Sequence, residues 1–230
     1  MIYNIALVLA LLCAGFVFWK RGKEEHFAED QLFDGFLLSV LGGIVVARCM
    51  YVILHFDTFG WTLVSWLNIF SHGGLSLSFG FVTAILLLIR FSKKQNWEFF
   101  GILDMWLPGV VLAAGVVQFG IFLQFQLQPA ILVAGVLLLA MSRYLYWLEY
   151  RYRTFAWYKS GQDVAKSGFI TAVGLIFLGL IFLTVSFFPL GKSVALAEFV
   201  DRVLCLLGIV FGFGLLLNRS GVLAKNKKRQ

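Results

Sequence analysis

His72 is the residue best suited to proton transfer in this chain, because it precedes two glycines in the segment SHGGLSLSFG, where an apolar helix is expected to begin. An unperturbed imidazole titrates near neutral pH and can act as a general base. Gly73 and Gly74 leave backbone N–H groups open to a phosphate at a helix start. The alternative is a histidine that only bonds a carbonyl there. The motif predicts phosphate-handling chemistry at the edge of an apolar segment.

Arg48 is the second candidate, because it lies inside the apolar run LGGIVVARCMYVIL. A guanidinium within hydrocarbon is costly unless it faces a polar cavity or a partner, so a functional or pairing role is one interpretation. The other is a snorkelling arginine whose head reaches the interface. Gly42 and Gly43, one to two turns earlier, would admit a close neighbouring helix.

A run of glutamines lies toward the end of a later apolar stretch, in QFGIFLQFQLQP. These residues are Gln118, Gln124, Gln126 and Gln128. They indicate either an uncharged polar lining at a helix end or ordinary hydrogen bonding between helices. Asp34 and Asp104 are expected to cap or pair structurally. No residues show metal-ligand spacing, and neither a metal nor a cofactor is predicted.

The elements that position these residues must be membrane helices. Hydrophobic residues make up 60% of the 230, charged residues 13%, and the mean hydropathy is +0.88, so lipid is the expected solvent. Apolar stretches recur at Ile2–Trp19, Phe33–Phe56, Leu75–Ile89, Phe99–Leu123, Ala130–Met141, Phe169–Phe188 and Val203–Leu217. The sequence predicts an all-α, polytopic integral membrane protein of about seven helices, in which the third, fifth and seventh extend into their flanks.

The basic residues predict the orientation of these helices. Sixteen of the 19 lie on alternate connections, which places the N-terminus outside and the C-terminus in the cytoplasm. The expected organisation is a transmembrane domain over 1–218 and a basic cytoplasmic tail over 219–230. The net charge of +7 then serves to anchor the chain to anionic lipid headgroups, and no nucleic acid is expected as a partner.

Two connections are long. The outer one, Asp57–Ser71, is aromatic and polar, and it is expected to lie in the interface or to dip back into the membrane. The inner one, Ser142–Ser167, interleaves Tyr, Trp and Arg, which predicts an amphipathic interfacial helix.

With these motifs the chain resembles prolipoprotein diacylglyceryl transferase over roughly its first 130 residues. The matching positions are Tyr3-Asn4, the GGIVVARCMYV segment with Arg48, His72-Gly73-Gly74-Leu75, the basic turn Arg90–Lys94, Asp104 and Pro108-Gly109. The family has seven helices in the bacterial cytoplasmic (inner) membrane and moves diacylglycerol from phosphatidylglycerol to a lipobox cysteine.

The resemblance implies the roles of particular residues. It implies His72 and Arg48 as catalytic residues, and Tyr3, Gly73, Gly74, Gln118 and Gln124 as substrate-binding residues. It also implies phosphatidylglycerol, membrane lipid and a prolipoprotein signal peptide as partners. The sequence assigns no oligomeric state.

The chain departs from the family pattern after Pro108-Gly109. The family continues with Gly-Arg-x-Gly-Asn-Phe-x-Asn-x-Glu, whereas this chain reads VQFGIFLQFQ, with Gln118 at the arginine position and Gln126 at the glutamate position. The outer loop that follows is nearly absent before Pro129. Two hypotheses therefore stay open: an active transferase, or a catalytically impaired relative that binds phospholipid or lipoprotein signal helices or serves a membrane assembly.

Overall fold

The protein is an antiparallel bundle of helices. The computed structural model describes residues 2–56, 66, 75–125, 129–158, 167–187 and 195–219. Within them lie α1 (Ile2–Glu24), α2 (Glu29–Leu54), α5 (Leu77–Lys94), α6 (Phe99–Phe125), α7 (Pro129–Tyr158), α8 (Phe169–Val185) and α9 (Ala195–Arg219). Five of these seven helices are long and apolar enough to cross a membrane, and α8 is a shorter apolar helix. The predicted all-α polytopic class is confirmed.

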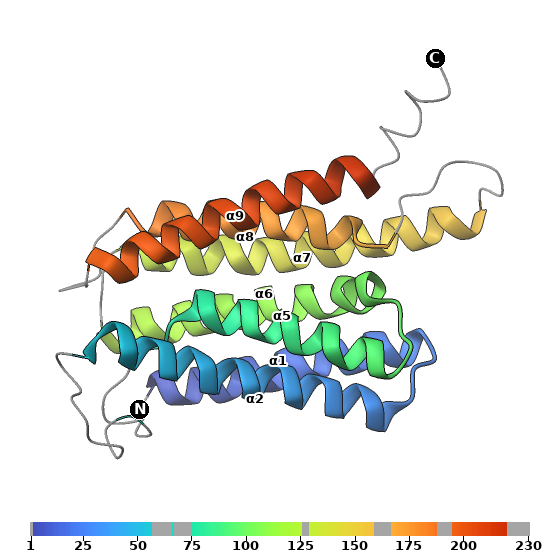
Figure 1. Cartoon of the computed structure of the whole chain (residues 1–230). Coiled ribbons are helices and arrows are strands. Elements are labelled where there is room, and N and C mark those ends of the chain that lie inside the picture. Colours follow the sequence, from blue (N-terminus) through green and yellow to red (C-terminus); the bar gives the residue numbers. More distant parts are fainter. Residues whose placement is uncertain are drawn as a thin grey trace.

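Successive helices run in opposite directions, and α6 lies at the centre of the bundle (Figure 1). It packs along α1 on one side and α7 on the other, while α2 pairs with α5 and α8 pairs with α9. The buried side chains of α6, among them Trp106, Leu107 and Val111, join the two larger core clusters. The helix therefore links the N-terminal helices to the C-terminal three.

One end of the bundle gathers the basic helix termini. Arg21 and Lys23 lie in the last turn of α1, and Lys93 and Lys94 in the last turn of α5. Figure 1 shows these ends beside the starts of α2, α6 and α8. We call this the basic end and the other the opposite end. Their assignment to the cytoplasm and the exterior stays a prediction.

The inner connection differs from its prediction. A separate interfacial helix was expected over Ser142–Ser167, but α7 continues without a break to Tyr158. Residues 142–149 of this helix pack into the bundle, because Ser142, Leu145 and Glu149 are buried at helical spacing. The interfacial interpretation is therefore wrong for residues 142–149, and it stays a prediction beyond them, where the side chains of 150–158 and all of residues 159–166 lie outside the description.

Candidate functional site

Arg48 is buried on the inner side of α2. Only 4% of the residue is exposed, its Nε donates to the carbonyl oxygen of Trp66 at 2.9 Å, and its guanidinium lies 6.0 Å from the centre of the Tyr51 ring. The outer connection thus returns at Trp66 to a point about 9 Å before the end of α2. Arg48 is held by the bundle and the returning chain, which favours a pairing role over a snorkelling one.

Close packing of α2 on α5 brings the start of α5 beside Arg48. A Cβ added at Gly43 would lie 2.9 Å from the Gly80 oxygen, and one at Gly80 would lie 2.9 Å from the Ala47 Cβ. Small residues at this spacing let two helix backbones approach. The Ser76 N–H consequently donates to the Ala47 carbonyl at 3.1 Å. His72, Gly73 and Gly74 lie outside the described residues, so their roles stay predictions.

Tyr3 and Gln124 meet where α1 begins and α6 ends. The Tyr3 backbone N–H donates to Gln124 Oε1 at 2.7 Å, and this carboxamide thereby satisfies one of the free N–H groups of the first turn of α1. Gly120 makes the approach possible, since a Cβ there would lie 2.3 Å from the Ala6 Cβ. The structure thus brings together two of the predicted substrate-binding residues.

Gln118 lies on the other side of α6. It is 7% exposed and sits against α7, where a Cβ added at Gly135 would lie 3.4 Å from the Gln118 Cβ. No hydrogen bond within the described part of the chain joins Gln118 to Arg48 or to the Tyr3–Gln124 pair. An arginine at this position would bury a full charge, whereas glutamine buries an uncharged carboxamide, which costs less. Gln126 and Gln128 fall outside the described residues.

An apolar groove opens between α7 and α8 at the opposite end of the bundle, the end at which Tyr3 meets Gln124. It has a volume of about 520 Å³ and is lined by the first two turns of α7, from Pro129 to Leu137, and by Ile181, Thr184 and Val185. Pro129 follows the last residue of α6 by four positions. An apolar hollow of this size suits an acyl chain.

The N-terminal helices are the part of the chain with known relatives. Residues 1–128 match the prolipoprotein diacylglyceryl transferase family, which is more than half of the chain. The chain belongs to this family. Tyr3, Arg48, His72, Gln118 and Gln124 all fall inside the match, whereas α7, α8 and α9 lie beyond it.

Several diacylglyceryl transferases are similar to this chain. A phosphatidylglycerol–prolipoprotein diacylglyceryl transferase of Finegoldia magna is 28% identical over 121 residues, which cover 53% of this chain and 48% of the relative. The enzyme of the same name from Ligilactobacillus salivarius is 25% identical over 121 residues, covering 53% and 45%. That of Clostridium tetani is 27% identical over 129 residues, covering 53% and 48%. The chain spans about half the length of the curated relatives it matches.

A buried ion pair at the basic end joins this family region to α7. Arg21 Nη2 lies 2.9 Å from Glu149 Oε2, and the side chains are 4% and 5% exposed. Arg21 Nη1 also contacts Glu24 at 2.9 Å, and the guanidinium lies 4.2 Å from the centre of the Tyr146 ring. This cluster is not predictable from sequence patterns, because nothing local relates two residues 128 positions apart.

Asp104 also has a structural role. Its carboxylate accepts hydrogen bonds from the backbone N–H groups of Gly168 and Thr171, at 2.6 and 2.8 Å, and from the Thr171 hydroxyl. Asp104 therefore caps the start of α8 from a neighbouring helix and satisfies the N–H groups that a helix start leaves free. The prediction that this residue caps or pairs structurally is confirmed.

Proposed function

We propose that this chain binds phosphatidylglycerol in the bacterial cytoplasmic (inner) membrane and transfers its diacylglyceryl group to the cysteine thiol of a prolipoprotein. The observation that carries the proposal is the position of Arg48. It is a buried cation inside the family region, at the point where the chain leaves and rejoins α2 around the His-Gly-Gly motif. Family membership supports the reaction class.

The described residues on both sides of the motif bond to neighbouring residues of α2. Trp66 accepts from Arg48, and Ser76 donates to Ala47. His72 precedes Ser76 by four residues, which reach at most about 14 Å even when fully extended. The covalent chain therefore limits the Cα–Cα distance between His72 and Ser76 to about 14 Å, and Ser76 bonds to Ala47, the neighbour of Arg48.

The reaction needs a base and a positive charge. The thiol sulfur attacks the glycerol carbon that carries the phosphate, a C–S bond forms and the C–O bond to phosphate breaks. In the proposed mechanism His72 takes the thiol proton. Glycerol phosphate leaves with the bonding electron pair, and Arg48 stabilises the charge that develops on it. The apolar groove of α7 and α8 offers room for an acyl chain.

Gln118 favours a second candidate function, that of a relative that holds phospholipid or a lipoprotein signal helix without turnover. It replaces the charged residue of the family pattern and is packed against α7. Loss of one aimed donor typically lowers a rate by about 10²–10³-fold. Under this candidate the site retains lipid but forms no thioether.

The deciding experiment incubates the purified chain with phosphatidylglycerol and a lipobox peptide, followed by mass spectrometry. The transferase proposal expects a peptide mass increased by one diacylglyceryl group, with this adduct lost in His72→Ala and in Arg48→Gln. Arg143→Gln is the matched control, because it removes the same charge from an exposed position of α7 outside the family region. Lipid that copurifies without any adduct supports the second candidate, and an adduct that persists in Arg48→Gln removes Arg48 from the site.

A further inference from the structure

His55 lies at the C-terminus of α2, at the opposite end of the bundle. Its backbone N–H donates to the Tyr51 carbonyl oxygen at 3.0 Å, and its Nδ1 lies 2.9 Å from the same oxygen. A carbonyl oxygen only accepts hydrogen bonds, so Nδ1 carries a proton and Nε2 of the neutral ring is an acceptor. Within the described part of the chain no hydrogen bond reaches Nε2, and the residue is half-buried. The helix end therefore fixes this ring and leaves one nitrogen open to a ligand.

The Tyr51 ring connects His55 to Arg48. The imidazole stacks on this ring with centroids 4.2 Å apart and planes at 23°, and the Arg48 guanidinium carbon lies 6.0 Å from the centre of the same ring. The guanidinium and the imidazole are therefore no more than about 10 Å apart, because their separation cannot exceed these two distances together. Intervals of three and four residues place all three side chains on one face of α2.

Trp66 contacts the same two turns of α2. Its carbonyl oxygen accepts from Arg48 Nε at 2.9 Å. Its ring packs edge-on against Phe56, the neighbour of His55, with centroids 6.5 Å apart and planes at 84°. One residue of the returning chain thus contacts α2 both at Arg48 and directly after His55. Arg48 and His55 therefore belong to one site.

The two ends of this stack recognise different chemical groups. Arg48 has only N–H donors and suits a phosphate, whereas Nε2 of the neutral His55 ring accepts and suits a hydroxyl. Hydrogen bonds of about 3 Å at each end leave no more than about 4 Å between the two groups of a ligand. A phosphate ester with a hydroxyl on the attached alcohol spans this distance. The headgroup of phosphatidylglycerol has this form.

We propose that His55 is a specificity-determining residue of the Arg48 site. Its Nε2 accepts a hydrogen bond from a headgroup hydroxyl of the phospholipid whose phosphate binds Arg48. This assignment rests on the proposed function, which supplies the lipid at Arg48. It predicts that the chain prefers a hydroxylated headgroup over a headgroup of equal charge without hydroxyls.

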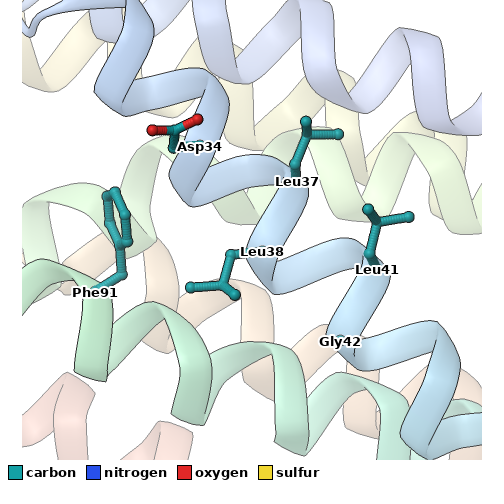
Figure 2. A pocket seen from close by; sticks show the side chains of 6 residues that line it. All are labelled: Asp34, Leu37, Leu38, Leu41, Gly42 and Phe91. Atoms are coloured by element: carbon teal, nitrogen blue, oxygen red, sulfur yellow. The ribbon is translucent and has the colours of Figure 1, made fainter.

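A groove between α2 and α5 is a different place where lipid can lie on the same helix (Figure 2). Asp34 in this groove precedes His55 by 21 residues, or roughly 30 Å along α2. Asp34→Asn therefore removes a carboxylate from the groove without touching the stack at Arg48, and it serves as the control. The groove has a volume of about 380 Å³ and is lined by Asp34, Leu37, Leu38, Leu41, Gly42 and Phe91.

Competition between two lipids tests the assignment. The full chain is equilibrated with equal amounts of phosphatidylglycerol and phosphatidylpropanol of matched acyl chains, and native mass spectrometry gives the ratio of the retained lipids. The two lipids carry the same charge, and only phosphatidylglycerol has headgroup hydroxyls. We expect the unaltered chain to retain about threefold to tenfold more phosphatidylglycerol, as one uncharged hydrogen bond allows.

Two substitutions separate recognition of the headgroup from capping of α2. His55→Asn keeps an N–H near the Nδ1 position for the Tyr51 carbonyl but removes the acceptor at Nε2, so the two lipids should be retained equally. His55→Gln places a carboxamide oxygen near the Nε2 position and should keep most of the preference. A residue that only caps the helix would give the reverse order, because Asn retains the capping bond and Gln does not.

A lipid ratio in His55→Asn equal to that of the unaltered chain would overturn the assignment, and so would a preference lost in Asp34→Asn. Equal retention of both lipids by the unaltered chain refutes the role of His55 alone. Retention of neither lipid refutes the proposed function as well. Far-ultraviolet circular dichroism confirms that each variant keeps its helices.

Discussion

Gly43→Ala tests whether the contact between α2 and α5 holds the start of α5 beside Arg48. The added carbon would lie 2.9 Å from the Gly80 oxygen and 3.3 Å from the Ala84 Cβ, whereas ordinary contacts begin at 3.4 Å. The two helices must therefore separate by roughly 0.5 Å at this point. Overpacking of this kind typically costs about 1–3 kcal/mol.

Gly208→Ala in α9 is the matched control, because a Cβ there meets nothing within 4 Å. Both substitutions replace a helical glycine with alanine, a change that contributes up to about 1 kcal/mol through helix propensity. That contribution cancels between the two variants. The difference in their free energies of unfolding, about 1–3 kcal/mol, then measures the α2–α5 contact alone.

Unfolding in mixed micelles with rising denaturant, followed by circular dichroism, provides the two free energies. The same variants are assayed for adduct formation with the lipobox peptide, where Gly43→Ala should reduce the yield and Gly208→Ala should not. Equal stability of the two variants would show that the helices are not in close contact at Gly43, and the positioning of Ser76 beside Arg48 would lose its basis.

Three further outcomes follow from contacts at the basic end, all measured in the same unfolding assay. Arg21→Leu should lower the free energy of unfolding by about 3–5 kcal/mol, because it leaves Glu149 buried without its counter-charge. The double variant Arg21→Leu with Glu149→Leu should recover most of that stability. A double variant as unstable as the single one would refute the ion pair. Asp104→Ala should cost about 2 kcal/mol by uncapping α8, so an unchanged midpoint would contradict the capping role. Gly168→Ala should cost about 1–3 kcal/mol, because φ there is +98° and the new carbon would lie 2.9 Å from Phe100 Cδ1; a neutral effect would exclude that backbone conformation.

Hydropathy predicted the helices because each must bury its backbone in lipid and so needs a long apolar run. The apolar stretch Phe33–Phe56 became α2 at Glu29–Leu54, a shift of a few residues at each end. The fifth apolar stretch, Ala130–Met141, was expected to extend into its flanks, and α7 runs from Pro129 to Tyr158. Neither glycine nor proline interrupts residues 142–158, and the buried positions Ser142, Leu145 and Glu149 continue the helical spacing. The sequence pattern therefore predicts a continuous helix beyond Met141.

The site was less predictable than the fold. Arg48 stood out because a charge within an apolar run has few explanations. The bond between Tyr3 and Gln124 and the pair of Arg21 with Glu149 depend on which helices become neighbours, and hydropathy does not specify helix order in space. Gly42 and Gly43 indicated from the sequence that another helix approaches α2 closely, and the structure shows that this helix is α5.

The shortness of α8 has a consequence for the surrounding bilayer. Its 17 residues span roughly 26 Å, a few ångströms less than the hydrocarbon thickness of about 30 Å. If α8 begins below the headgroups, the N–H groups of its first turn lack water as an acceptor. The Asp104 carboxylate accepts from the Gly168 and Thr171 N–H groups instead. Lipids that contact α8 must then compress to meet it, at a fraction of a kcal/mol per ångström, so the protein should favour the thinner regions of a heterogeneous membrane.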